Sequence, residues 1–122
     1  FQLDQWNLAE QFYLIHLARE TSLQTRATVL NNLGLIKTEL KEYKEALDYF
    51  EQTAKLEEDD KSVNAQDRAL NYNNMATVYY RQNRITDAMD YYQRAIDLVD
   101  KAPDQNQEMR ATLYNNMATV LN

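Results

Sequence analysis

One seven-residue string occurs twice, without a change, in this chain of 122 residues. Residues 72–78 and residues 114–120 both read Tyr-Asn-Asn-Met-Ala-Thr-Val, and residues 30–34 carry a weaker copy, Leu-Asn-Asn-Leu-Gly. The period is 42 residues, both within the strings (Asn32, Asn74, Asn116) and outside them (Ala46, Ala88). A fixed period of this size is the signature of a repeat protein, in which copies of one supersecondary unit stack on one another.

The apolar residues inside each copy have the spacing of an α-helix. A stripe at i, i+3, i+4 and i+7 marks a first helix: Tyr72, Met75, Ala76 and Tyr79, then Tyr114, Met117, Ala118 and Leu121. A second stripe marks another helix: Ala88, Tyr92, Ala95, Ile96 and Val99, with an earlier copy at Ala46, Phe50 and Ala54. Short polar breaks separate the two helices, and Asn83 is suited to the left-handed conformation that ends a helix. Each unit is therefore predicted to be an antiparallel helix pair.

Longer polar breaks, at residues 57–62 and 100–104, separate one unit from the next. Ser62 and Asp104 are the expected N-caps, with Gln107 completing a capping box, so second helices should end near 58 and 101 and first helices begin near 63 and 105. The predicted division is a lone second helix at 1–22, full repeats at 23–61 and 62–103, and a first helix at 104–122. Both ends fall inside a unit, which suggests part of a longer array.

Composition argues against most enzyme classes and several ligands. The chain has no cysteine, one glycine, one proline and one histidine. These counts argue against a thiolate or histidine metal site, a glycine-rich phosphate cradle and a cofactor site. Neither Thr77 nor Thr119 has a base beside it in register, so nucleophilic catalysis has no support. The carboxylates lack the spacing of a calcium loop, and a solvated outer face explains them better.

Charge and hydropathy restrict the partners. Thirteen basic residues against nineteen acidic ones give a net charge of −6, which disfavours nucleic acid. No apolar run is long enough for a membrane span, and no signal-peptide pattern opens the sequence. We therefore expect a cytoplasmic protein that does not contact a membrane. His16 falls on the apolar side of the first helical stretch and is expected to be a core residue.

The pattern resembles the tetratricopeptide repeat. The residues that carry the likeness are Leu33-Gly34, Met75-Ala76 and Met117-Ala118 in first helices, and Ala46 with Phe50, and Ala88 with Tyr92 and Ala95, in second helices. Usual units have about 34 residues, and the longer period of 42 is similar to the repeats of kinesin light chains and of bacterial peptide-sensing regulators. Three residues depart from the pattern: Lys37 replaces the aromatic Tyr79, Thr53 replaces Ala95, and Lys41 stands where glycine is common.

The resemblance implies an all-α fold, an α-solenoid of stacked antiparallel helix pairs in a right-handed superhelix. It also implies that the first helix of each pair lines the concave wall. Opposite the core stripe of that helix lie Leu70, Asn74, Thr77 and Arg81, with Thr28, Asn32, Leu35 and Glu39, and Thr112, Asn116 and Thr119, in the equivalent places. These residues are the expected lining of a groove.

Paired asparagines in the middle of each first helix are the sharpest functional signal. Each costs roughly 0.5–0.7 kcal/mol of helix stability relative to alanine, and an amide offers the donor and acceptor that match a peptide unit. The predicted peptide-binding residues are Asn32, Asn74, Asn116, Thr77, Thr119 and Arg81, with Asn31, Asn73 and Asn115 beside them. For this last set the alternative is that they bond across to neighbouring helices.

The sequence thus favours a non-enzymatic protein-interaction scaffold that binds an extended or partly helical peptide. The alternatives are the non-catalytic repeat portion of a larger enzyme or peptide-sensing regulator, and a pure spacer. The groove lacks a lysine–arginine clamp, which disfavours capture of a terminal carboxylate. Head-to-tail self-association is a further hypothesis, through Met117 and Leu121 of one copy and Trp6, Phe12 or Tyr13 of another.

Overall fold

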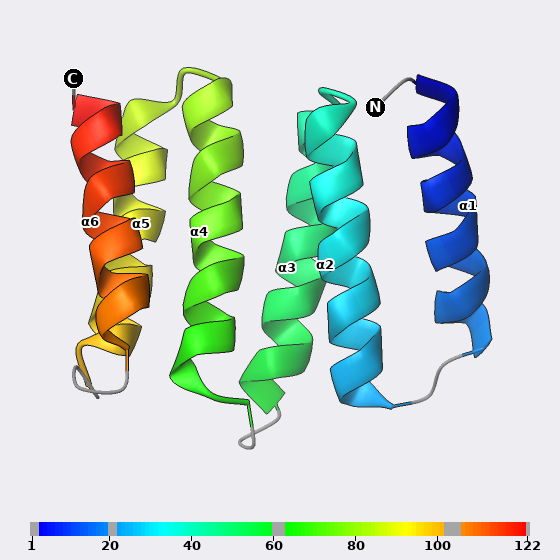
Figure 1. The fold of residues 1–122 in the computed structure, drawn as a ribbon, viewed down its shortest axis with the longest axis horizontal. Coiled ribbons are helices and arrows are strands. Elements are labelled where there is room, and N and C mark those ends of the chain that lie inside the picture. The colour runs from blue at the N-terminus through cyan, green and yellow to red at the C-terminus, as the bar shows by residue number, and fades with distance from the viewer. Residues whose placement is uncertain (1–2, 20–21, 60–62, 102–105, 122) are drawn as a thin grey trace. The chain divides into compact units, whose positions relative to one another are not determined.

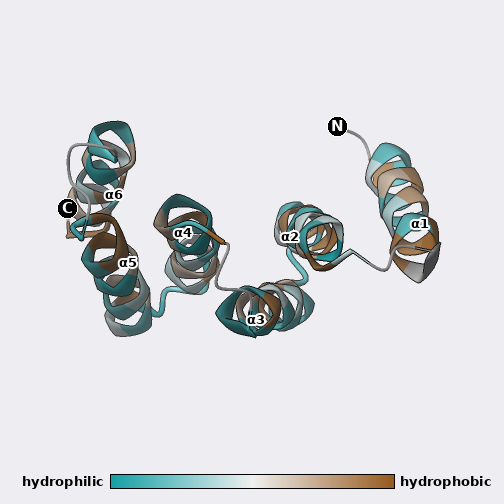
Figure 2. Cartoon of the chain, turned by 90° about the horizontal axis from the view of Figure 1, so that it is seen from below, coloured by the Kyte–Doolittle hydropathy of each residue, from teal (hydrophilic) through white to brown (hydrophobic). Residues whose placement is uncertain are grey.

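The computed structural model describes residues 3–19, 22–59, 63–101 and 106–121, and over these residues the chain is six α-helices without a strand (Figure 1). The helices are α1 (Leu3–Arg19), α2 (Leu23–Glu39), α3 (Tyr43–Asp59), α4 (Ala65–Arg81), α5 (Ile85–Val99) and α6 (Gln107–Leu121). The chain divides into two compact units, Phe1–Lys61 with α1 to α3 and Ser62–Asn122 with α4 to α6. Each helix carries both hydrophilic and hydrophobic residues (Figure 2), as expected for helices that bury one stripe.

In the first unit α2 packs on both α1 and α3. Gly34 of α2 lies close to Phe50 of α3, because a Cβ added at Gly34 would lie 2.5 Å from the Phe50 ring. Both residues are buried, as are Leu33 and Ala46 beside them. The glycine in the middle of α2 is therefore explained by helix packing: its missing side chain admits the aromatic ring of the paired helix.

In the second unit α5 packs on both α4 and α6. Tyr91 of α5 lies between two rings of α4, with ring centroids 5.9 Å from Tyr72 and 5.3 Å from Tyr79. The guanidinium of Arg84 lies over the outer part of this cluster, 4.7 Å from the centroid of Tyr79. We refer to Tyr72, Tyr79 and Tyr91 as the tyrosine cluster. It joins the two helices of one pair through stacked and tilted aromatic contacts.

The turns between paired helices confirm the expectation for Asn83 and extend it to Lys41. Both residues adopt the left-handed conformation, with φ of 62° at Asn83 and 63° at Lys41. Glu42 N–H then donates to the Lys37 carbonyl at 2.9 Å, and Arg84 N–H donates to the Tyr79 carbonyl at 2.8 Å. This six-to-one bond is the Schellman ending of a helix. The turn reverses the chain over the three residues between the helices and so sets each helix beside its partner.

Three sequence expectations about helix ends and burial are wrong or fall outside the described residues. Helix α4 begins at Ala65, and its N-cap is Asn64, whose Oδ1 accepts the N–H of Asp67 at 2.8 Å. The expected cap, Ser62, lies outside the described residues. The other expected cap, Asp104, lies outside the described residues, and α6 begins at Gln107 rather than near 105. His16 is exposed rather than part of the core, and its ring stacks on Phe12.

We predict that Lys41→Gly stabilises the first unit. A left-handed residue with a Cβ costs about 1–2 kcal/mol, while glycine loses roughly 0.5–1 kcal/mol of extra chain entropy on folding, so the net gain should be about 0.5–1 kcal/mol. Urea unfolding followed by the fluorescence of Trp6, the chain's single tryptophan, reports on this unit. The matched control is Lys55→Gly, at an exposed position inside α3, which should lose about 0.7–1 kcal/mol. A loss for Lys41→Gly similar to the control's would contradict the prediction.

The asparagine face of α2, α4 and α6

The asparagine pairs lie in the middle of α2, α4 and α6. Five of the six are half-buried: Asn31, Asn32, Asn73, Asn74 and Asn116; the sixth, Asn115, is exposed. The half-burial gives these amides fixed surroundings while keeping part of each side chain accessible to solvent. A position of this kind suits a group that recognises a ligand, and it equally suits a bond to a neighbouring helix.

One of these amides bonds across to the next asparagine helix. The Nδ2 of Asn116 in α6 donates to the Oδ1 of Asn73 in α4 at 2.8 Å. Asn73 therefore makes the bond to a neighbouring helix that was the alternative to a ligand role, and its partner is a residue of the predicted ligand-binding set. We call Asn73 and Asn116 the amide pair. It joins two first helices of successive repeats within the second unit.

The threonines of the predicted site donate their hydroxyl protons within their own helices. Thr77 Oγ1 donates to the carbonyl of Asn73, and Thr119 Oγ1 donates to the carbonyl of Asn115, each at 3.0 Å. Thr77 also lies 3.4 Å from the hydroxyl of Tyr92, which is buried in α5. Such bonds to the preceding turn are usual for threonine in a helix. A ligand would therefore meet these hydroxyls mainly as acceptors.

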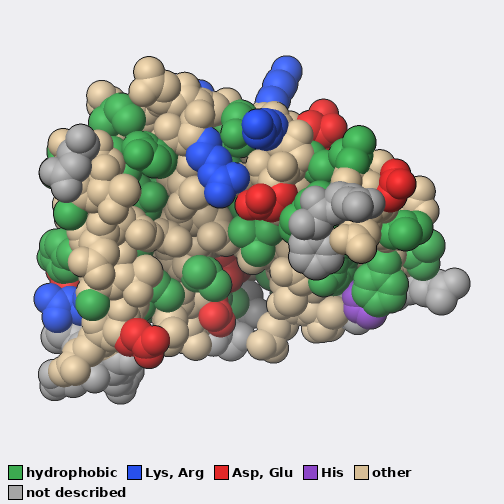
Figure 3. Space-filling model, turned by 45° about the horizontal axis from the view of Figure 1, so that its top comes forward, with side chains coloured by type: hydrophobic (Ala, Val, Ile, Leu, Met, Phe, Trp, Pro, Cys, Tyr) green, Lys and Arg blue, Asp and Glu red, His purple; other side chains and the backbone are tan. Residues whose placement is uncertain are grey.

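The remaining predicted residue, Arg81, is exposed at the last position of α4. Large apolar side chains are exposed along the same helices, namely Leu35 in α2, Leu70 and Tyr80 in α4 and Tyr114 in α6. On the face drawn in Figure 3 the described charged side chains are scattered among apolar and uncharged polar ones. The chemistry available on these helices is therefore that of amides, hydroxyls and apolar groups with few charges.

A cluster of charges in the first unit was missed by sequence reasoning. The Nζ of Lys37 lies 2.7 Å from a carboxylate oxygen of Glu10, 2.6 Å from Glu42 and 3.1 Å from Glu45. Its side chain is only 12% exposed. Desolvation lowers the pKa of Lys37, but the hydrogen bonds that Lys37 donates to the three carboxylates outweigh it and hold that pKa above its ordinary value. The bond from Lys37 in turn lowers the pKa of Glu42.

We call Lys37 with Glu10, Glu42 and Glu45 the glutamate cluster. It stands where the second unit has an aromatic contact. Lys37 is one 42-residue period before Tyr79, so the two units use different chemistry at the same position of the repeat. Glu10 belongs to α1, and Glu42 and Glu45 flank or begin α3, so the lysine ties α2 to both neighbours. The replacement of an aromatic by lysine was the one signal in the sequence, but the distant Glu10 could not be paired with it from spacing alone.

Neither a metal site nor a membrane-spanning helix is found among the residues that the structure describes. No group of three or more His, Cys, Asp or Glu side chains there could hold a metal ion. None of the described helices is both long and apolar enough to cross a bilayer. The amide pair, the threonines and the exposed apolar residues thus remain the candidate functional groups.

We predict that Lys37→Met loosens α1. The substitution leaves three carboxylates facing one another without their cation, so amide hydrogen exchange in α1 should speed up while that in α5 is unchanged. In the parent, the ionic contribution is lost as pH falls through the lowered pKa of Glu42, below 4.5, or rises through the raised pKa of Lys37, above 10.5. Lys55→Met, at an exposed position of α3, is the control. Equal protection of α1 in both variants would contradict a role for the cluster.

Comparison with known proteins identifies the repeat. The family model of the tetratricopeptide repeat matches residues 25–101 and 67–122. No curated protein matches the chain. Among solved structures, the crystal structure of BtubC (BKLC) from P. vanneervenii aligns with a TM-score of 0.81 at 18% identity. The alignment covers 95% of this chain and 48% of that one, so the chain spans about half the length of that relative.

At 18% identity the likeness to BtubC shows the fold alone, and that fold is the all-α helical repeat solenoid expected from the 42-residue period. The family model covers most of the sequence, from the start of α2 to the end of α6. Together with the helix pairs and their Schellman turns, this match leaves no other assignment for the repeat: the chain belongs to the tetratricopeptide repeat family.

Proposed function

We propose that this chain is a scaffold that binds an extended or partly helical peptide along its asparagine-bearing helices. Tetratricopeptide repeats typically serve as non-catalytic modules for protein–protein interaction. Each of α2, α4 and α6 would offer its own amides to the ligand. The proposed contacts are Asn32, Asn74 and Asn116, together with Thr77, Thr119 and Arg81. The adjacent asparagines complete the proposed peptide-binding set: Asn31, Asn73 and Asn115.

The observation that carries the proposal is the position of the asparagines. All six lie in helix interiors, where together they cost roughly 3–4 kcal/mol relative to alanine, and the half-buried ones are held in fixed surroundings. Asn32, Asn74 and Asn116 follow the 42-residue period, so each of the three first helices offers a ligand the same residue. An amide can accept a backbone N–H and donate to a backbone carbonyl, which is the bonding pattern of an extended peptide.

Two other functions stay open. One is the repeat portion of a larger enzyme or of a bacterial peptide-sensing regulator, in which the same helices present a segment to another domain. The other is a spacer in which the asparagines serve only packing. The first shares the peptide-binding surface with our proposal, and the second does not, so a direct binding measurement separates the spacer from both.

The proposal is tested by peptide-display selection on the parent and on Asn32→Ala/Asn74→Ala/Asn116→Ala. Peptides enriched by the parent should bind the triple variant at least tenfold more weakly, a loss of about 1.4 kcal/mol. The matched control is Gln11→Ala/Gln52→Ala/Gln93→Ala, which removes three exposed amides from α1, α3 and α5 and should leave binding intact. Equal binding by all three proteins, or no enrichment at all, would favour the spacer.

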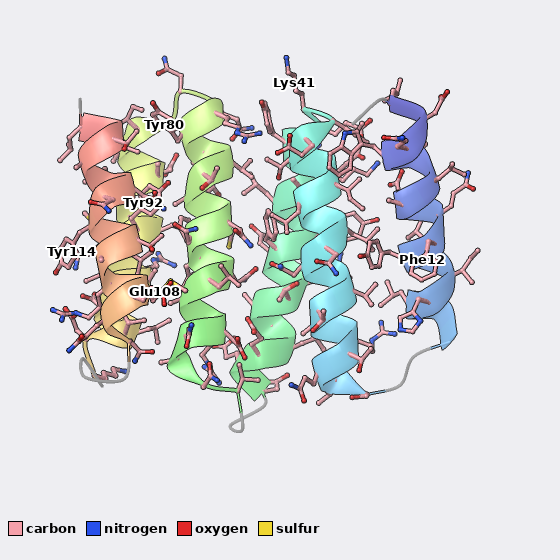
Figure 4. The ribbon with its side chains drawn as sticks, viewed as in Figure 1. Phe12, Lys41, Tyr80, Tyr92, Glu108 and Tyr114 are labelled. Atoms are coloured by element: carbon pink, nitrogen blue, oxygen red, sulfur yellow. The ribbon has the colours of Figure 1, made fainter. Side chains whose placement is uncertain are left out.

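We also propose that a second copy of the chain is a partner of α6. The apolar stripe of α6 repeats that of α4, yet Tyr114 is 50% and Leu121 68% exposed, whereas Tyr79, the counterpart of Leu121, is 8% exposed. Figure 4 shows Tyr114 projecting outward from α6. In α4 the equivalent stripe is covered by α5, which inserts Tyr91 between Tyr72 and Tyr79. The face of α6 is thus suited to a second helix of the repeat that carries an aromatic residue at this place.

Helix α1 carries such a residue. Matching Ala9 to Ala88 places Phe12 at the position of Tyr91, and Phe12 is 65% exposed. Leu8 and Ile15, one turn before and one turn after it, are exposed as well. Phe12 of one copy would then lie between Tyr114 and Leu121 of another, as Tyr91 does in the tyrosine cluster. This contact is heterologous, because two different faces meet, and it would add copies head to tail.

Complementary variants test this association by light scattering. The parent should grow in mass with concentration, whereas Phe12→Lys and Leu121→Lys should each stay monomeric, because a lysine in an apolar contact is strongly unfavourable. A mixture of the two variants should form a dimer, since one retains an intact α6 and the other an intact α1. A parent that stays monomeric at high concentration, or a mixture that does not assemble, would contradict the proposal.

A further inference from the structure

The amide pair has a defined polarity. A side-chain amide has two distinct ends, an oxygen that only accepts and an NH₂ group that only donates. In the pair, the NH₂ of Asn116 points to the oxygen of Asn73 at 2.8 Å. If the amide of Asn116 turned over, two oxygens would face each other at hydrogen-bond distance, which is repulsive. With Asn73 presenting its oxygen, as the structure shows, only one of the two orientations of the Asn116 amide forms the bond.

Asn73 lies on the more firmly held of the two helices. It is half-buried in the middle of α4, and its backbone carbonyl accepts the hydroxyl proton of Thr77 at 3.0 Å. Thr77 in turn lies 3.4 Å from the hydroxyl of Tyr92, which is buried in α5. The acceptor of the pair thus belongs to a helix that is held by its neighbour, whereas Asn116 lies on α6 with its side chain half-exposed.

In this orientation the Oδ1 of Asn116 and the second proton of its NH₂ group are both left for a ligand. Among the described residues, the side chain of Asn116 is hydrogen-bonded to Asn73, and this bond uses a single proton of the NH₂ group. The oxygen of Asn116 cannot take part in it. This oxygen is therefore an acceptor of fixed direction, supplied by a side chain that is still accessible to solvent.

We propose that Asn73 is a positioning residue that presents the Oδ1 of Asn116 as an acceptor for one backbone N–H of a bound peptide. The inference rests on the proposed peptide-binding function and specifies its ligand further. The segment opposite Asn116 must offer a backbone N–H, so a proline or an N-methylated residue is excluded at that one position. Side-chain identity there is not read by this contact.

The experiment compares Asn73→Ala, Asn73→Asp and Asn116→Ala for binding of a peptide selected on the parent. Asn73→Asp keeps an acceptor for the Asn116 NH₂ group and should bind within about twofold of the parent. Asn73→Ala removes the acceptor and should weaken binding about five- to tenfold, a loss of roughly 1–1.4 kcal/mol. Asn116→Ala should weaken binding at least as much, and adding Asn73→Ala to it should cost nothing more, because the two residues act as one unit.

Gln93→Ala is the matched control. Gln93 lies on α5 in the same unit, and its side-chain amide donates to Asp97 at 2.9 Å, so its loss removes a comparable hydrogen bond away from the asparagine face. This variant should bind like the parent. Circular dichroism on each variant checks that the helices are retained.

Two readouts go beyond affinity. An N-methyl scan of the peptide should find one position where methylation costs the parent about tenfold and costs Asn116→Ala nothing. In the free protein, the side-chain NH₂ signals of Asn116 in ¹⁵N NMR should show one hydrogen-bonded proton in the parent and in Asn73→Asp, and none in Asn73→Ala. The second readout needs no peptide.

The outcomes separate this inference from the proposed function. Peptide binding that is unchanged in Asn73→Ala, or lost in Asn73→Asp, would overturn the positioning role while peptide binding itself stands. NMR signals of Asn116 that do not respond to Asn73→Ala would overturn it as well. Failure of the parent to select any peptide would instead remove the proposed function, and with it the ligand that this inference describes.

Discussion

The helix pairs α2/α3 and α4/α5 are held by buried contacts at which the repeat places small residues. Gly34 and Ala46 in the first unit are repeated 42 residues later as Ala76 and Ala88, and all four are buried. At Gly34 even a methyl group would meet the ring of Phe50. Because isolated helices of 15 to 17 residues are marginal in water, these contacts are what allow the helices to exist and the exposed faces to be presented.

The two units solve the same packing problem with different chemistry. At one position of the repeat the second unit has Tyr79, which stacks on Tyr91, and the first unit has Lys37 among three glutamates. An aromatic contact is hardly affected by salt, whereas a partly exposed ionic cluster is screened by it. In α1 no described side chain is fully buried. The attachment of α1 therefore depends more on solution conditions than the attachment of α5 does.

The sequence was sufficient for the architecture because period and apolar stripe are local properties. The helix pairs, their turns and the left-handed Asn83 follow from spacing and from the conformational preferences of single residues. The predictions that failed were those that depend on which residues lie nearby in the folded chain. Serine and asparagine are both good N-cap residues, so the residue types alone did not identify Asn64 as the cap of α4. The stripe that contains His16 was identified, but a stripe does not say what covers it, and Lys37 could not be matched to Glu10 at a distance.

The asparagines show the same limit inside the candidate site. Residues 72–78 and 114–120 are identical in sequence, yet Ala76 is buried and Ala118 exposed, and Asn73 is bonded across to α6 whereas its counterpart Asn115 is exposed. The hydrogen bond of the amide pair joins Asn73 to Asn116, which are not equivalent positions of the repeat. A repeat therefore copies residues without copying their surroundings. The orientation of a side-chain amide depends on the group to which it is hydrogen-bonded. Which hydrogen-bonding group each asparagine offers to a ligand therefore depends on such pairs rather than on the single residue.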